Sequence, residues 1–150
     1  MQFSIILALA ASASAATLQR RQAQTYPIAD FSADCIPHSN YCSHSYNFTV
    51  NSDPSLSPSH CSAFVQGPDQ LPAVEEGTCS DNVGYTWSIE PTSDGGLDFA
   101  IWYAFNARSN ITYCASIPAS QITTETDGTA NTQHYTGPKN LTASISECPA

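Results

Sequence analysis

The chain has 150 residues, of which thirteen are acidic and only four are basic, giving a formal net charge of −9. Four basic residues are too few to form a basic surface that binds phosphate groups or anionic lipid headgroups. Nucleic acid and anionic membranes are therefore excluded as partners. Six cysteines, an even number, predict a set of disulfides if the chain is secreted.

The N-terminal segment predicts secretion. An apolar run from Ile5 to Ala11 leads into small residues that include Ala13-Ser14-Ala15. The run is too short to span a membrane and is typical of a secretory signal peptide, which we place at residues 1–16. Residues 17–21 end in Arg20-Arg21 and predict a short pro-segment with a dibasic processing site.

Residues 22–150 would then form the mature chain, whose length suits one domain with a core of its own. Arg108 and Lys139 are its only basic residues against thirteen acidic ones, a formal charge of −11. Such a charge favours solubility. We therefore expect a single secreted, extracellular domain without membrane insertion.

The first clear strand signal begins at Cys42. Apolar and polar side chains alternate from there to Val50, with Cys42, His44, Tyr46, Phe48 and Val50 on one side. Residues 25–34 show little periodicity and predict a lead-in. Residues 35–42 predict a turn around Pro37 with a cysteine at each end.

The middle of the chain mixes loops and strands. Residues 51–60 are rich in Ser, Pro and Asp and predict a loop. Residues 61–66 predict a short strand. Residues 67–84 predict a long polar loop that carries Cys79.

A meander of strands follows. Tyr85, Trp87 and Ile89 alternate with polar residues, and Asp94-Gly95-Gly96 supplies turn chemistry. Residues 97–105 are the most apolar strand. A turn at residues 106–110 precedes the next strand, which continues to Ile117.

The last part of the chain is less regular. Residues 121–133 are rich in Thr and predict an irregular segment, residues 133–136 predict a short strand, and Leu141, Ala143 and Ile145 mark the last strand. No amphipathic helical run of useful length occurs. The sequence therefore predicts an all-β fold, a single antiparallel β-sandwich or β-barrel stabilised by disulfides.

Three disulfides can be placed on this pattern. Cys114 and Cys148 share the polar register of their strands, so a bridge between them is plausible. Cys61 and Cys79 flank the long loop, which leaves Cys35 for Cys42. The rival pairing joins Cys35 to Cys79 and Cys42 to Cys61. A zinc site is the competing interpretation, but the chain has no CxxC motif or paired His spacing, so we expect no metal.

Three N-glycosylation acceptor motifs begin at Asn47, Asn110 and Asn140. Each asparagine falls on the polar register of its expected strand. On this register a glycan at Asn47 would extend into solvent.

Signatures of catalysis are lacking in the sequence. There is no GxSxG, HExxH, phosphate loop or dinucleotide motif, and no cofactor is expected. The four histidines show no ligand spacing. Glu75-Glu76, or Asp94 with Asp98, could suggest a glycosidase pair, but they lie in turns or on polar registers and are better interpreted as surface acids. We therefore expect no enzymatic activity.

Trp102 is the candidate partner-binding residue. It points away from the apolar face of its strand, between the small residues Ala100 and Ala104. An exposed tryptophan on a flat sheet can stack on sugars or anchor a protein partner. The alternative is a Trp102 that is packed or covered by a loop.

Several short motifs, in order and over most of the mature chain, carry a family resemblance. They are the run FSADCIPHSNYC from Phe31, LPAV from Leu71 with Gly77-Thr78-Cys79, DGGL from Asp94, IPAS from Ile117 and YTGP from Tyr135. With these motifs the chain resembles small secreted proteins of filamentous fungi related to the Alternaria major allergen and to elicitors of hypersensitive cell death in plants.

The resemblance implies a compact β-barrel or β-sandwich with an extracellular role at the interface of fungus and plant, as an elicitor or effector. The implied partner is a host plant protein or a cell-wall component. The usual four cysteines of that group match Cys35, Cys42, Cys61 and Cys79, and Cys114 and Cys148 look like an addition. No active site is implied. The alternative function is a carbohydrate- or cell-wall-binding module, and a hydrolase is the third hypothesis.

Overall fold

The protein is an antiparallel β-barrel. The computed structural model describes residues 25–49, 57–67, 70–82, 84–145 and 148, so the expected signal peptide and pro-segment lie outside the described residues. The elements in chain order are β1 (Thr25–Cys35), β2 (Tyr41–Phe48), β3 (Ser59–Gln66), β4 (Val74–Cys79), β5 (Tyr85–Pro91), β6 (Leu97–Asn106), β7 (Ser109–Ile117), η1 (Ala119–Gln121), β8 (Ile122–Asp127), β9 (Ala130–Tyr135) and β10 (Leu141–Ser144).

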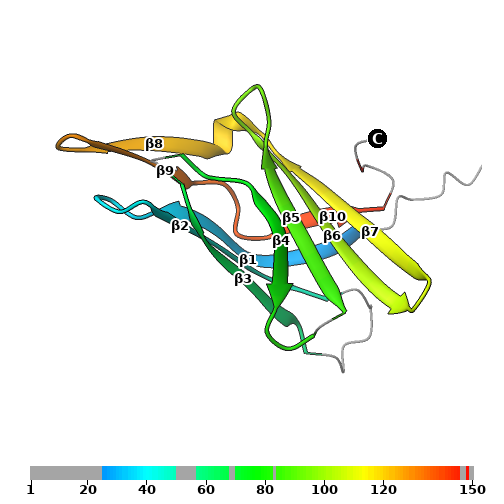
Figure 1. Ribbon diagram of the computed structural model, residues 1–150. Coiled ribbons are helices and arrows are strands. Elements are labelled where there is room, and N and C mark those ends of the chain that lie inside the picture. Colours follow the sequence, from blue (N-terminus) through cyan, green and yellow to red (C-terminus); the bar gives the residue numbers. More distant parts are fainter. Residues whose placement is uncertain (1–24, 50–56, 68–69, 83, 146–147, 149–150) are drawn as a thin grey trace, which may run out of the picture.

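Eight of these strands close the barrel. They follow one another from β1 to β7, and β10 then pairs with both β7 and β1. Figure 1 shows the hairpin of β8 and β9 projecting to one side of this barrel. The predicted all-β antiparallel fold is confirmed. Of the two predicted architectures, β-sandwich and β-barrel, the structure shows the β-barrel. Within the described residues no helix is long and apolar enough to cross a membrane.

The prediction of an irregular lead-in at residues 25–34 was wrong, because β1 spans this segment. A bulge between Ala29 and Ser32 breaks its alternation, and Asp30 adopts a left-handed φ of 53° there. The bulge places Ile28 and Phe31, three residues apart, both inside the barrel. The strand was therefore not recognisable from the sequence, because the bulge shifts the alternation of buried and exposed residues by one position.

The prediction of one long loop at residues 67–84 was also wrong, because it contains β4. A bulge between Val74 and Gly77 again breaks the alternation. Gly77 is buried against the indole of Trp87, whose Nε1 donates a hydrogen bond to the Thr78 carbonyl at 3.1 Å. A side chain is missing at Gly77 because the Trp87 ring occupies its place.

The contact between β3 and β4 is short. Only Cys61 with Cys79 and Ser62 with Thr78 are paired in register, although β3 pairs with β2 along its whole length. Figure 1 shows the two strands meeting at this end and diverging toward the other. The barrel wall therefore has an open seam between residues 63–66 of β3 and residues 74–77 of β4.

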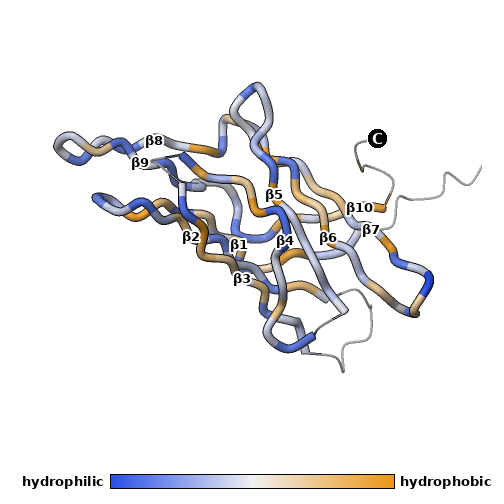
Figure 2. The backbone as a smooth tube through the Cα atoms, in the orientation of Figure 1, coloured by the Kyte–Doolittle hydropathy of each residue, from blue (hydrophilic) through white to orange (hydrophobic). Residues whose placement is uncertain are grey.

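The Thr-rich segment at residues 121–133, predicted as irregular, forms most of the β8–β9 hairpin. All six of its strand pairs from Ile122–Tyr135 to Asp127–Ala130 are in register, and Gly128 has the positive φ that its turn needs. The side chains of β8 are mostly exposed, and Figure 2 shows the hairpin as largely hydrophilic. Because neither face of β8 is buried, its sequence carries no apolar alternation to detect.

The six cysteines form three disulfides. Cys35 is bonded to Cys42, Cys61 to Cys79 and Cys114 to Cys148, which is the preferred pairing and excludes the rival one. The first two bridges lie among the buried core residues, and the third lies on the outer face of the barrel. Three disulfides are typical of proteins from an oxidising, extracellular environment.

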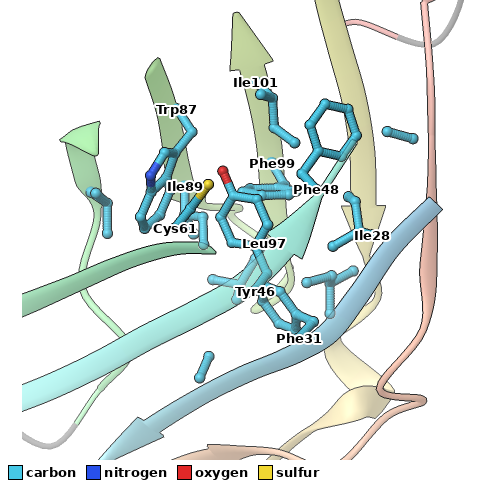
Figure 3. Close-up of a cluster of buried hydrophobic side chains, with 14 of the residues drawn as sticks. Ile28, Phe31, Tyr46, Phe48, Cys61, Trp87, Ile89, Leu97, Phe99 and Ile101 are labelled. Carbon is cyan, nitrogen blue, oxygen red and sulfur yellow. The ribbon is translucent and has the colours of Figure 1, made fainter. Parts of the chain in front are cut away.

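Aromatic rings dominate the barrel interior (Figure 3). Tyr46 presents its ring edge-on to Trp87 and to Phe99, with centroids 5.2 and 4.9 Å apart. Phe31 packs against Phe99 from β1. These contacts bring β1, β2, β5 and β6 together, so burial of large rings stabilises the closed barrel.

His44 lies on the same buried face of β2 as Tyr46 and has no solvent exposure. Neither of its ring nitrogens makes a hydrogen bond of normal geometry with a described residue. Burial lowers the pKa of His44 to about 4, and the Pro72 carbonyl and the Asp34 carboxylate raise it by less. The histidine predicted as an ordinary strand residue is therefore a neutral ring enclosed in the core.

This burial predicts a loss of stability in acid. The unfolded chain binds a proton at His44 near pH 6.5, whereas the folded chain does so only near pH 4. Between these values the unfolded state holds the extra proton, so the free energy of unfolding should fall as the pH drops, by up to about 3 kcal/mol in total. Urea unfolding of wild type and His44→Phe from pH 7 to 4 checks this. An equally steep fall in the variant would contradict it.

A candidate ligand groove at Trp102

The outer face of β5, β6 and β7 carries the candidate site. The register sets three rows of side chains across these strands. The first row is Thr86, Trp102 and Thr112, the second is Ser88, Ala100 and Cys114, and the third is Glu90, Asp98 and Ser116. Because residues of one parity face outward on every strand, the three rows form one continuous surface.

A cavity of about 420 Å³, here called the Trp102 groove, lies over this surface. Trp102 is half-buried in it, and the small side chain of Ala100 in the next row leaves space beside the indole ring. Trp102 therefore faces outward, as predicted, and is neither fully exposed nor covered. The volume is in the range typical of small-ligand pockets.

The third disulfide builds one wall of the Trp102 groove. Cys114 projects outward from β7, and its bond to Cys148 holds Cys148 against this face of the sheet. The Cys148 sulfur lies 3.7 Å from the Thr112 carbonyl oxygen. Without this bridge the surface around Trp102 would lose that wall.

Two carboxylates border the opposite part of the groove. Glu90 and Asp98 are direct cross-strand neighbours on β5 and β6, and both line the cavity. The Ser116 hydroxyl donates to Asp98 at 2.9 Å, whereas Glu90 is exposed. Like charges in direct opposition are destabilising. A positively charged group of a ligand would relieve this repulsion, and a neutral ligand would not add to it.

The carboxylates considered from the sequence are distributed differently. Asp94 does not reach the groove, because its carboxylate accepts hydrogen bonds from the Thr92 hydroxyl and the Gly96 amide within the turn, which lower its pKa. Glu75 and Glu76 lie on β4 and border a second groove. The pair that faces the Trp102 groove is Glu90 with Asp98, which was not predicted from the sequence.

The glycosylation candidates occupy different surroundings. Asn110 and Asn140 are exposed. Asn47 is half-buried on the outer face of β2, where its Nδ2 donates to Asp30 at 2.9 Å and its Oδ1 lies 3.0 Å from His60 Nδ1. The described residues contain no group of three His, Cys, Asp or Glu side chains placed to hold a metal ion.

Most of the groove was not predictable from the sequence, because the pattern of a single strand does not show which residues of its neighbours lie beside Trp102. The turn at Asp94-Gly95-Gly96 sets the register of β5 against β6, and this register places Glu90 opposite Asp98. The same register places Ser88 opposite Ala100, and the register of β6 with β7 places Thr112 opposite Trp102. The Cys114–Cys148 bridge was predicted from the shared register of its cysteines, but its position beside Trp102 depends on the register of β6 with β7.

Comparison of the chain with protein-family models, with curated proteins and with solved structures gives no significant match. The candidate site therefore rests on its own geometry.

Proposed function

We propose that the protein is a secreted, non-enzymatic fungal protein of the elicitor or effector type, and that its Trp102 groove binds a carbohydrate of the cell wall. The observation that carries the binding proposal is the half-buried indole of Trp102, which lines a cavity together with hydroxyl and carboxylate groups. The elicitor role is supported by the sequence resemblance to secreted fungal proteins and by the disulfide-rich extracellular architecture.

A sugar ring matches this arrangement in two ways. Its apolar C–H face packs on an indole ring, which supplies a large, rigid contact area. Its hydroxyl groups can hydrogen-bond to the Ser88 and Thr112 side chains and to the Glu90 carboxylate, all of which line the cavity. Ala100 keeps the space beside the ring open. The same surface would fit a purely apolar ligand poorly, because hydroxyl and carboxylate groups are among its lining side chains.

The charge of the groove narrows the class of sugar. Glu90 and Asp98 place two carboxylates at one end of the cavity, and the described residues offer no lysine or arginine ion pair to neutralise them. A polymer of uronic acids would meet like charge. Neutral sugars such as chitin or glucan fragments, and amino sugars such as chitosan, are compatible with the site.

Replacing Trp102 with alanine should weaken binding of chitin, chitosan or glucan fragments by about tenfold or more, because the stacking surface is lost. Isothermal titration calorimetry of both proteins measures this. Pectin fragments are the control ligand and should not bind. The chain has only two tryptophans, and Trp87 is fully buried, so a fluorescence change on titration reports Trp102. Equal affinity of wild type and Trp102→Ala would contradict a site at the groove.

The same preparations test the absence of catalysis. Glu90 is exposed, and Asp98 accepts a hydrogen bond from Ser116, so neither carboxyl lies in the apolar pocket that a glycosidase acid requires. Incubation with each oligosaccharide should therefore release no shorter products. Product release by wild type that is lost in Glu90→Gln would establish a hydrolase instead.

The elicitor role has a separate test. Infiltration of purified protein into leaves should trigger a defence response, and Trp102→Ala should be weaker if sugar recognition contributes. No response across several hosts, together with no binding to plant extracts, would contradict this part of the proposal. That outcome would not contradict sugar binding at the Trp102 groove, which the oligosaccharide titration tests separately.

A further inference from the structure

The seam between β3 and β4 leaves two strand edges free. Beyond Ser62 and Thr78 the register of the two strands contains no further pairs, so no strand among the described residues pairs with residues 63–66 on that side. A groove of about 540 Å³ lies there, lined by residues of both strands. Free backbone N–H and C=O groups on an exposed strand edge are a template for pairing with another chain.

Two aromatic rings lie beside this edge. Phe64 on β3 is 62% exposed and Tyr41 on β2 is 42% exposed, and their rings stack with centroids 4.8 Å apart and planes 5° from parallel. Both side chains point outward, whereas Cys42, which follows Tyr41, and Cys61, three residues before Phe64, point into the core. Two exposed, stacked rings next to a free strand edge form an apolar surface patch. Burial of this patch by a bound partner would be favourable.

The other side of the seam is acidic. Glu75 and Glu76 are both exposed on β4 and line the groove, and no described ion pair includes either of them. The described part of the chain places Arg108 in the turn between β6 and β7 and Lys139 before β10, so neither belongs to this groove. The seam thus combines a free edge, an aromatic patch and uncompensated negative charge.

We propose that the β3 edge of this seam binds an extended, basic peptide segment of a partner protein by strand addition. The peptide backbone would pair with residues 63–66, at the usual spacing of about 4.8 Å between strands. One face of the added strand would place an apolar side chain on Phe64 and Tyr41, and its basic side chains would lie toward Glu75 and Glu76. A second copy of this chain fits poorly, because each copy has a net charge of −9.

A capped eight-residue peptide that alternates lysine with phenylalanine or valine is the probe. It should bind the full chain, and the backbone amide signals of residues 63–66 should shift most in NMR spectra and become protected from hydrogen exchange. A peptide with alternate amides N-methylated has the same side chains but cannot form the ladder, so its affinity should fall at least about tenfold. Phe64→Ser, at an exposed position, should weaken binding to a similar extent.

Charge is tested with matched variants. The double variant Glu75→Gln with Glu76→Gln should bind the peptide more weakly, and its binding should depend less on salt concentration. The control is the double variant Glu125→Gln with Asp127→Asn, which removes two exposed acids from the β8–β9 hairpin. This control should bind the peptide as the wild type does. Trp102→Ala should leave peptide binding unchanged, which separates this site from the sugar groove. Three results would each overturn the proposal. The N-methylated peptide could bind as tightly as the unmodified one, or the two acid variants could lose the same affinity. The unmodified peptide could also fail to bind at millimolar concentration. Self-association through the same residues would assign the seam to a second copy and also overturn it.

Discussion

Replacing Gly77 with alanine should lower the free energy of unfolding by about 3 kcal/mol or more. A Cβ atom at this position would lie 2.2 Å from Cε2 of Trp87, and two further ring atoms lie within 2.6 Å. The indole is enclosed by the core and held by its hydrogen bond to Thr78, so it cannot move aside without disturbing β4 and β5. Overpacking of this kind forces shifts of backbone and side chains. Urea unfolding followed by circular dichroism measures the effect.

Gly84→Ala is the matched control for this substitution. Its closest neighbour would be the Asn82 side-chain oxygen at 3.1 Å, which belongs to a side chain near the surface, so the cost should be less than about 1 kcal/mol. A double-mutant cycle with Trp87→Leu isolates the cause, because the penalty of Gly77→Ala should shrink once the indole is removed. An undiminished penalty in that background would mean that the Trp87 contact is not responsible.

Removing the Cys114–Cys148 bridge should destabilise the protein by about 4 kcal/mol and also weaken ligand binding at Trp102. The bridge closes a loop of 34 residues, the longest of the three, and its loss increases the entropy of the unfolded chain. It also releases the groove wall that Cys148 forms beside Thr112. Urea unfolding and oligosaccharide titration of Cys114→Ala with Cys148→Ala test the two effects.

The bridge between Cys35 and Cys42 provides the comparison. It closes only seven residues, on strands that do not line the Trp102 groove. The double variant Cys35→Ala with Cys42→Ala should therefore retain the sugar affinity of the folded protein, although loss of two buried sulfurs also lowers its stability. If both double variants lose affinity equally, the groove wall is not the reason.

The sequence predicted those strands in which one face is regularly buried. β2, β5 and β6 have an uninterrupted alternation, and their buried residues, such as Tyr46, Trp87 and Phe99, were recognisable from it. β1 and β4 were missed because bulges at Asp30 and before Gly77 shift the alternation by one residue. β8 was missed because its side chains remain in solvent. An alternation of apolar and polar residues therefore does not reveal a strand whose period changes or whose two faces both remain in solvent.

The candidate site was predictable to a similar extent. Trp102 could be assigned to the outer face from the strand pattern alone. Its neighbours Glu90 and Thr112 come from other strands, and only the register of β6 with β5 and β7 brings them beside it. The seam between β3 and β4 could not be predicted, because it depends on where pairing ends rather than on which residues form strands.

The closure of the barrel by β1 and β10 has a consequence for how the chain folds. Thr25 pairs with Ser144 and Ile28 with Leu141, so the wall is completed by residues that are more than a hundred positions apart. Contacts of such high sequence separation form late and slowly, since a long stretch of chain must be ordered first. During synthesis β1 leaves the ribosome before its β10 partner exists. Its edge toward β10 therefore stays unprotected until β10 is synthesised, and closure of the barrel waits for this strand.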